Sequence, residues 1–115
     1  MRETLEQRKR WARMFGFADG PVGWTKIHTD GRLEYAPHDF ANIECSYFGA
    51  ATKELLDAGW QLMKIRDGGY QWVNIYWWEA VDDRARSEKG DDLGVVTMLA
   101  FEVHRAQMAV ASNSK

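Results

Sequence analysis

Apolar side chains recur at helical spacing near the start of the chain, where neither glycine nor proline interrupts residues 2–15. The stripe consists of Leu5, Trp11, Ala12 and Phe15. This spacing predicts a short basic helix over residues 2–15. A dense group of turn-forming residues should end the helix, namely Gly16, Gly20, Pro21 and Gly23.

The next apolar residues lie in two short β-rich stretches around Asp30 and Gly31. An Asp-Gly step is typical of a two-residue type I′ turn, which needs positive φ at both central positions. We therefore expect a hairpin with strands at about residues 23–28 and 32–36.

A longer periodic stretch begins at Phe40, just after Pro37. Apolar residues follow at positions 40, 43, 47, 48, 51, 55 and 58, which is helical spacing sustained for five turns. The pattern predicts a helix over residues 38–58. Gly59 fits the position just past its end, where a left-handed backbone conformation is needed.

The segment from Trp60 to Trp78 holds two β-rich runs around Gly68 and Gly69, which predicts a second hairpin. A two-residue loop at these glycines would pair Trp60 with Trp77, Leu62 with Ile75, and Lys64 with Val73. One face would carry Trp60, Leu62, Val73, Ile75 and Trp77. The other would carry Met63, Ile65, Tyr70, Trp72, Asn74, Tyr76 and Trp78. Both faces are apolar, so a helix, a second copy of the chain or a different molecule should cover the second face.

The stretch 79–92 has six acidic and three basic side chains and almost nothing to bury, which indicates a solvated loop. Apolar spacings of three and four then predict a helix over residues 93–110, with Asp91 or Asp92 as its N-cap. Alternation at period two over 95–103 also permits a strand there, although the helix-forming residues favour the helix.

The predicted element order is α-β-β-α-β-β-α. The simplest arrangement is one α+β domain over residues 1–111, in which helices pack on one face of a four-stranded antiparallel sheet, followed by a disordered tail at 112–115. A compact chain of this length should have a radius of gyration of roughly 13 Å.

One stretch resembles a known kind of domain. Glu54-Leu55-Leu56-Asp57-Ala58-Gly59-Trp60-Gln61-Leu62 is similar to the helix-to-strand step of some small uncharacterised prokaryotic and phage α+β domains, in which leucines precede Gly-Trp-x-Leu. The resemblance implies a βαββ-type core, and it implies no activity.

Charge and cysteine content exclude several protein classes. Fifteen Lys and Arg against seventeen Asp and Glu give a net charge of −2, which is too balanced for a whole-surface nucleic-acid binder or a polybasic membrane protein. The single cysteine, Cys45, excludes an intrachain disulfide. We expect a cytoplasmic protein, because the chain shows no signal peptide and no apolar run long enough to cross a bilayer.

Motifs for phosphate loops, zinc proteases and nucleophile elbows are not found in the sequence. A metal site would need His28, His38 and Asp39 to converge, but exposed and helix-capping roles explain these residues better. Cys45 is better explained as a small buried hydrophobe than as a nucleophile. We therefore expect no enzyme, no cofactor and no metal, with a metal-assisted hydrolase as the distant alternative.

The basic run from Arg8 to Arg13 combines four bases with Trp11, as nucleic-acid binders do. Four bases in a net acidic chain are few, so nucleic acid is not an expected partner. A helix that docks on another protein explains the run equally well.

The chain contains six tryptophans, four tyrosines and five phenylalanines. Tyrosine and tryptophan concentrate at binding hot spots. The sequence therefore predicts a non-enzymatic regulatory module that binds a partner protein, or a second copy in a homodimer, through the aromatic strand face and the basic helix. The candidate contact residues are Tyr70, Trp72, Asn74, Tyr76, Trp78, Arg66, Arg10 and Trp11. Small motif-poor proteins of this kind resemble phage-encoded inhibitors of host defence proteins.

An alternative use of the same face is a cage for a small flat or cationic ligand such as a nucleotide. Asn74 and Arg66 would then supply its polar contacts. Binding of a nucleotide would quench tryptophan fluorescence, whereas binding of a protein partner would not require it.

Overall fold

The computed structural model describes residues 3–66, 68–74 and 86–113 of the chain. Its elements in order are α1 (Leu5–Met14), β1 (Ala18–Gly20), β2 (Gly23–Ile27), β3 (Leu33–Tyr35), α2 (Ser46–Asp57), β4 (Trp60–Lys64), β5 (Tyr70–Asn74) and α3 (Leu93–Asn113). The strands form two antiparallel sheets, in the orders β1-β2-β3 and β4-β5. The α+β class is confirmed, whereas the predicted single four-stranded sheet is wrong.

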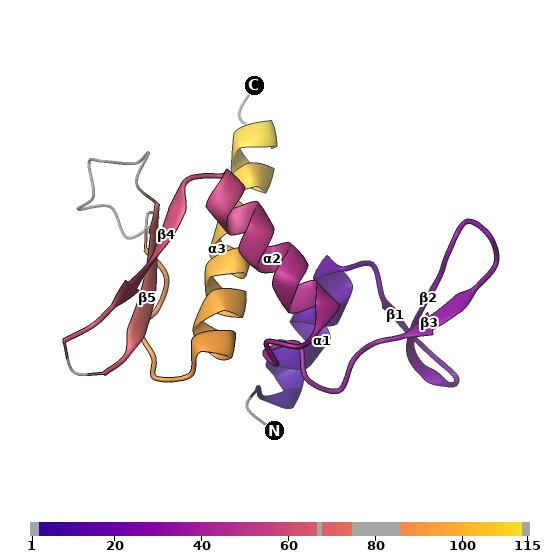
Figure 1. Ribbon diagram of the computed structural model, residues 1–115. Coiled ribbons are helices and arrows are strands. Elements are labelled where there is room, and N and C mark those ends of the chain that lie inside the picture. Colours follow the sequence, from indigo (N-terminus) through magenta and orange to yellow (C-terminus); the bar gives the residue numbers. More distant parts are fainter. Residues whose placement is uncertain (1–2, 67, 75–85, 114–115) are drawn as a thin grey trace.

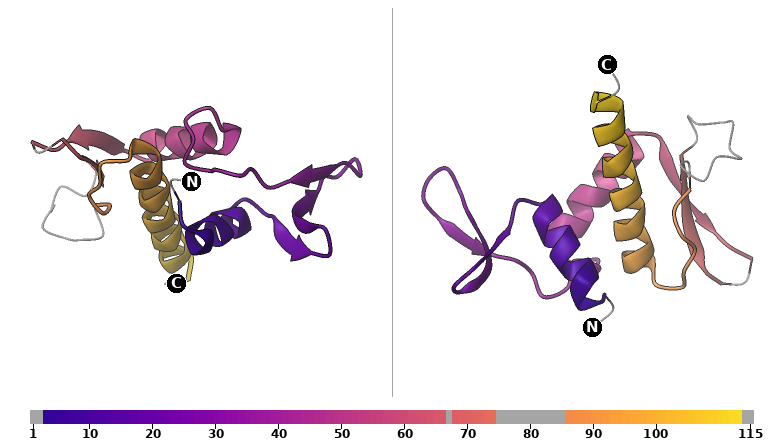
Figure 2. Two further views of the ribbon diagram at one scale, coloured as in Figure 1. Left: turned by 90° about the horizontal axis from the view of Figure 1, so that it is seen from below. Right: turned by 180° about the vertical axis from the view of Figure 1, so that it is seen from behind.

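The three helices lie between the two sheets, which extend from opposite sides of the helical body (Figures 1 and 2). We call residues 18–35, which form β1, β2 and β3, the arm, and residues 60–74 the packed hairpin. The radius of gyration is 15.2 Å, above the roughly 13 Å of a compact chain of this length. The arm accounts for much of this extension, because it projects from the helices.

The core lies around α3, against which α2 and the packed hairpin are placed. The ring of Phe15 stacks on Phe40 and on Phe101, with centroid distances of 5.7 and 5.3 Å. The largest buried side chains include Trp11, Phe40, Leu55, Trp60, Met98 and Phe101. The arm contributes no buried residue, so the core is built from the helices, the loop before α2 and the packed hairpin.

The predicted N-terminal helix is confirmed as α1. A capping box begins it, since the Thr4 hydroxyl accepts a hydrogen bond from the Gln7 amide while the Gln7 side chain accepts one from the Thr4 amide. The helix ends before Gly16, whose φ of 90° belongs to the left-handed region that glycine tolerates. β1 follows in a segment for which only turns were predicted.

The helix predicted over 38–58 begins only at Ser46, so the N-terminal part of that prediction is wrong. Side chains supply turns there instead: Asp39 Oδ1 accepts from the Ala41 amide at 3.1 Å, and Asn42 Oδ1 accepts from the Glu44 amide at 3.0 Å. Phe40 is nevertheless buried. The apolar spacing therefore predicted the burial of Phe40 correctly, but it did not predict the backbone conformation there. Gly59, with φ of 93°, ends the helix as predicted.

Both hairpins close with a longer turn than the predicted two-residue loops. The Gly31 amide donates to the His28 carbonyl at 2.9 Å, and the Gly68 amide donates to the Ile65 carbonyl at 2.9 Å. Each of these glycines has positive φ, and no other described residue type does. This is the three-residue loop in which a type I turn is followed by a left-handed glycine, so the type I′ prediction at Asp30 is wrong.

The longer turn changes the register of the packed hairpin. Trp60 pairs with Asn74 rather than with Trp77, and Leu62 pairs with Trp72. The observed pairing differs from the predicted one by an odd number of residues, and such a register shift moves every β5 side chain to the opposite face of the hairpin. Tyr70, Trp72 and Asn74 therefore share the face of Trp60, against the prediction of two separate apolar faces. The predicted partners from Ile75 to Trp78 lie outside the described residues.

The segment after residue 85 is not the wholly solvated loop that its charges predicted. The Tyr70 amide donates to the Gly90 carbonyl at 2.6 Å, and the Ser87 amide donates to the Trp72 carbonyl at 2.9 Å. Residues 86–90 thus lie along the outer edge of β5, and Ser87 is buried. The first part of the predicted loop, 79–85, lies outside the described residues.

The C-terminal segment is a helix and not a strand. Asp92 caps α3, because its Oδ1 accepts from the amides of Gly94 and Val95 at 3.0 and 3.2 Å. The helix continues to Asn113, two residues into the predicted tail. None of the described helices combines the length and the apolar character that crossing a bilayer requires.

Candidate functional site

The structure does not bring the predicted contact residues to one surface. Trp72 is 2% exposed, and its indole N–H donates to the Thr97 hydroxyl at 2.9 Å. Asn74 is buried on the same face, and Tyr70 is half-buried beside the core. The remaining members of that face, Tyr76 and Trp78, lie outside the described residues. Of the described part of the predicted aromatic face, Trp72 and Asn74 are therefore buried within the chain, and only Tyr70 keeps part of its surface accessible.

The basic helix is engaged in contacts within the chain. Trp11 is buried and donates its indole N–H to the Glu102 carboxylate, which also pairs with Arg10 at 3.2 Å. The Arg8 guanidinium donates to the Pro37 carbonyl at 3.0 Å. Arg66, the other predicted basic contact, is exposed in the turn of the packed hairpin and makes no such bond to the residues that the structure describes. The helix therefore fastens α3 and the loop before α2 to each other.

The side chains considered for metal binding also lie apart. His28 Nε2 is 2.7 Å from Glu34 Oε1, whereas His38 is exposed. Within residues 3–66, 68–74 and 86–113, no three histidine, cysteine or carboxylate side chains gather as a metal site would require. His104 pairs with Glu54 at 3.3 Å, and burial lowers the pKa of this histidine. Cys45 precedes α2 and makes no capping bond through its side chain.

The arm has two faces of opposite character, which its strand register defines. Lys26 lies opposite Glu34, and both point to the inner face, toward the helical body. Glu34 Oε2 accepts a hydrogen bond of 2.5 Å from the Tyr47 hydroxyl of α2. Lys26 Nζ donates to the Phe15 carbonyl at 3.2 Å. The inner face is therefore a polar attachment between the arm and the body.

Aromatic rings complete this attachment. The Lys26 ammonium lies 4.8 Å from the ring centroids of Phe17 and Tyr47, and the Arg13 guanidinium lies 5.2 Å from that of Trp24. Cations at this distance are attracted to the negative face of a ring. The arm is thus held by a few polar and cation–π contacts and by Trp24, which packs against the core of the body, and it has no apolar core of its own.

The attachment changes the acidity of its members. The Tyr47 hydroxyl lowers the pKa of Glu34, with further lowering by His28 and Lys26. Burial raises the pKa of Tyr47, and the carboxylate of Glu34 raises it further. The tyrosine therefore stays protonated and the glutamate ionised around neutral pH, which is the combination that preserves their hydrogen bond.

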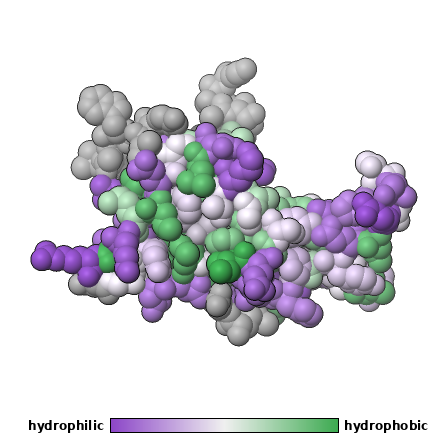
Figure 3. Space-filling view, in the orientation of Figure 1, coloured by the Kyte–Doolittle hydropathy of each residue, from purple (hydrophilic) through white to green (hydrophobic). Residues whose placement is uncertain are grey.

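The outer face of the arm is apolar and uncovered. We define it by Thr25, Ile27, Leu33 and Tyr35, which the register places side by side. Ile27 is 74% exposed, Tyr35 59% and Leu33 48%. Figure 3 shows hydrophobic side chains at the surface of the arm, at the right of the view. Within the described residues, nothing packs on this face.

Sequence reasoning missed the outer face, although a signal for it was present. Thr25, Ile27, Leu33 and Tyr35 alternate with polar residues at period two in both predicted strands, which is the pattern of a sheet with one apolar side. The predicted four-stranded sheet would have covered that side with helices. The structure places the apolar side outward because Lys26 and Glu34 occupy the attached side.

A shallow groove lies where the arm meets the loop before α2. Its volume is about 410 Å³, and it is lined mainly by polar side chains, including Glu34, His38, Asn42, Cys45 and Tyr47. The ionised Glu34 and the protonated Tyr47 in this groove are bonded to each other. Both groups therefore serve to attach the arm to the body.

In comparisons with known proteins, no family model, curated protein or solved structure matches this chain.

Proposed function

We propose that this chain is a non-catalytic protein-binding module whose contact surface is the outer face of the arm. The observation that carries the proposal is the exposure of Ile27, Leu33 and Tyr35 on one side of a sheet. Adjacent exposed apolar side chains of this kind typically mark an interaction site on a soluble chain. This proposal keeps the predicted function class and moves the contact surface from the packed hairpin and the basic helix α1 to the arm.

The polar attachment supports this proposal. If the arm served only to complete the core, its apolar side would face the helices and its charged side would face water. The arm does the reverse: Lys26 and Glu34 are directed inward, and Ile27 and Tyr35 are directed outward. A sheet with its apolar side outward presents a pre-formed surface to a partner. Because this surface is already ordered, binding costs little conformational entropy.

Size and composition indicate the kind of partner. Three large side chains form a patch on the order of 300 Å², whereas a stable interface buries roughly 800 Å² on each partner. The outer face therefore fits the centre of a larger contact that includes the polar rim of the arm, such as Asp30 and Arg32. We propose that the partner is a different protein with an apolar groove or surface, and a dimer of the purified chain in sedimentation would assign the outer face to a second copy instead.

The double substitution Ile27→Ser with Tyr35→Ser tests the proposal. A matched control is Leu56→Ser with Met108→Ser, because these side chains are 54% and 50% exposed on helices outside the arm. Each tagged protein would be used to purify bound proteins from the native cells, with identification by mass spectrometry. We expect the arm variant to lose a protein that the wild type and the control both retain. Retention by the arm variant, or loss by both variants, would contradict the proposal.

A further inference from the structure

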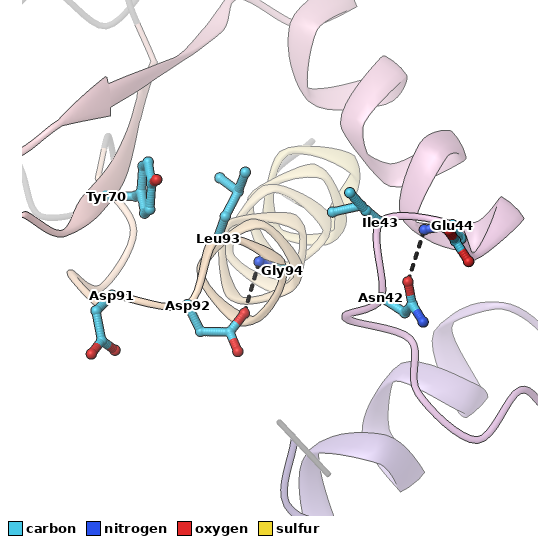
Figure 4. A pocket seen from close by; sticks show the side chains of 8 residues that line it. All are labelled: Asn42, Ile43, Glu44, Tyr70, Asp91, Asp92, Leu93 and Gly94. Atoms are coloured by element: carbon cyan, nitrogen blue, oxygen red, sulfur yellow. Dashed lines mark hydrogen bonds between the residues drawn. The ribbon is translucent and has the colours of Figure 1, made fainter.

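A second groove lies around the first turn of α3, and it shares Asn42 and Glu44 with the groove beside the arm. Its volume is about 710 Å³, and it is lined by Asn42, Ile43, Glu44, Tyr70, Asp91, Asp92, Leu93 and Gly94. These residues come from the loop before α2, the packed hairpin and the start of α3. Figure 4 shows Tyr70, Leu93 and Ile43 in a row across the first turn of α3, with Asp91 and Asp92 beside it. Among the described residues, none of the arm lines this groove.

A close backbone contact forms one wall. A Cβ atom at Gly94 would overlap the carbonyl oxygen of Ala41, so only glycine lets the loop 39–45 rest against α3. The Ala41 amide also donates to Glu3 Oε1 at 3.2 Å. The opposite wall is tied through the pairing of Tyr70 with Gly90. Both walls are therefore fixed by backbone contacts, and the groove is formed before any ligand binds.

The floor of the groove is apolar and accessible. Ile43 is 63% exposed, and Leu93 and Tyr70 are half-buried. An aliphatic side chain can therefore pack on the row that these three form. The Tyr70 ring adds an aromatic face at one end, which attracts a cation as well as an apolar group.

The rim of the groove is acidic, and none of its described residues is basic. Glu44 and Asp91 have no ion-pair partner among the described residues, in contrast to Glu54 and Glu102, each of which contacts an arginine. Two unpaired carboxylates at the rim of an apolar groove give it a negative potential that favours a positively charged ligand.

We propose that this groove binds a peptide segment of a partner protein in which lysine or arginine residues flank an aliphatic side chain. The aliphatic side chain packs on Ile43 and Leu93. The stems of the basic side chains cover apolar surface, while their charged ends reach Glu44 and Asp91. This site goes beyond the arm, since it rests on different residues and a different ligand chemistry.

Two synthetic peptides serve as probes, one alternating lysine with leucine and one alternating glutamate with leucine. Binding is followed by NMR chemical shifts of the full chain and by isothermal titration. We expect the lysine peptide to shift the amides of residues 42–44 and 91–95, and we expect weaker binding as salt rises. The glutamate peptide should leave these signals unchanged. Equal binding of the two peptides, or shifts outside the groove only, would overturn the proposal.

The double variant Glu44→Gln with Asp91→Asn removes the rim charges without changing side-chain size. We expect it to bind the lysine peptide at least fivefold more weakly. The matched control is Glu6→Gln with Asp19→Asn, which removes the same charge from exposed positions away from the groove and should bind as the wild type does. An equal loss in both variants would show nonspecific attraction to an acidic chain and would overturn the proposal.

Two further variants separate the remaining outcomes. Ile43→Asn should weaken peptide binding, whereas Leu56→Asn, at a similarly exposed leucine, should not. The arm variant Ile27→Ser with Tyr35→Ser should bind the peptide normally, so failure of the arm proposal would leave this one intact. A dimer in sedimentation that Ile43→Asn dissolves would assign the groove to a second copy and overturn the peptide proposal.

Discussion

The arm and the packed hairpin close with the same type of turn, but the apolar side of one is exposed and that of the other is buried. In both, an amide of a positive-φ glycine donates across the turn, from Gly31 in one and from Gly68 in the other. Yet Trp72 of the packed hairpin is inside the core, whereas Ile27 of the arm is mostly exposed. The turn thus sets strand register, and the residues that face the helices decide which side is buried.

The difference follows from what each hairpin offers to its neighbour. The packed hairpin presents Trp60 and Trp72 to the helices, and the Trp72 indole finds a hydrogen-bond partner in Thr97. The arm presents Lys26 and Glu34, which need polar partners and find them in the Phe15 carbonyl and the Tyr47 hydroxyl. Burying charged groups deeply is costly, so the arm is attached at its surface and does not join the core.

The largest expected effect separates the two hairpins by stability. Trp72→Ala should lower the free energy of unfolding by about 3–5 kcal/mol, because it leaves a cavity, and it also removes the partner of the Thr97 hydroxyl. Tyr35→Ala in the arm should change it by less than about 0.5 kcal/mol. Urea denaturation of both variants measures the contrast. Similar losses in the two would show that the arm is part of the core.

Glu3, a buried carboxyl group that contacts the loop before α2, should make the stability of the fold depend on pH. Burial raises the pKa of Glu3 to about 7, with Asp39 raising it further. A raised carboxyl pKa stabilises the fold below the unfolded value, 4.5, and this stabilisation is lost as pH rises through about 7.

Glu3→Gln tests this pH dependence. We expect the wild-type free energy of unfolding, relative to that of the variant, to fall between pH 5 and pH 8, because the glutamine cannot ionise. Comparing the two proteins cancels His104, whose lowered pKa acts in the opposite direction. Parallel pH curves for the two proteins would show that Glu3 ionises normally.

Substitutions of the two turn glycines, Gly31 and Gly68, form a matched pair with an intermediate expected effect on stability. An added Cβ meets no atom within 4 Å at Gly31 or at Gly68, so alanine at either position costs only its left-handed conformation, about 1–2 kcal/mol. We expect Gly68→Ala to lower the global free energy of unfolding by this amount. Gly31→Ala should leave global unfolding nearly unchanged and should speed hydrogen exchange only within the arm. Equal global losses would contradict independent behaviour of the arm.

The smallest expected effect is acid release of the arm. The lowered pKa of Glu34 means that its attachment is present above the unfolded value of 4.5 and is lost as pH falls through the folded value. Amide exchange in residues 24–35, corrected for the intrinsic rate, should therefore increase as pH falls below 4.5, before exchange in the packed hairpin does. Tyr47→Phe should move the onset to higher pH, because the hydroxyl is the main cause of the lowered pKa.

Local signals made part of this structure predictable. Gly59 and Asp92 mark a helix end and a helix start through the backbone geometry or hydrogen bonds that each supplies, and neither depends on distant contacts. Register was less predictable, because a two-residue type I′ loop needs positive φ at both central residues, and only Gly31 and Gly68 adopt it, not Asp30 or Gly69. One wrong loop length placed Trp72 on the wrong face.

Other features depended on tertiary contacts that no local pattern records. Phe40 has helical spacing relative to later apolar residues, yet it enters the core from a turn. Ser87 lies in a charged stretch, yet it is buried against Trp72 because its hydroxyl accepts from that backbone amide at 2.9 Å. The alternation of Ile27 and Leu33 contained a signal for an apolar face that the sequence analysis did not use, and its direction depends on Lys26 and Glu34 on the other side.

The exposure of the outer face in the monomer is the central claim, and paramagnetic relaxation by a soluble gadolinium chelate tests it most directly. At a concentration where sedimentation shows a monomer, the methyl signals of Ile27 and Leu33 should broaden strongly. Those of Leu55 and the indole signal of Trp72 should remain sharp. Equal protection of the arm and core methyl groups would show that the chain covers its own arm, and it would contradict a free apolar surface on the monomer.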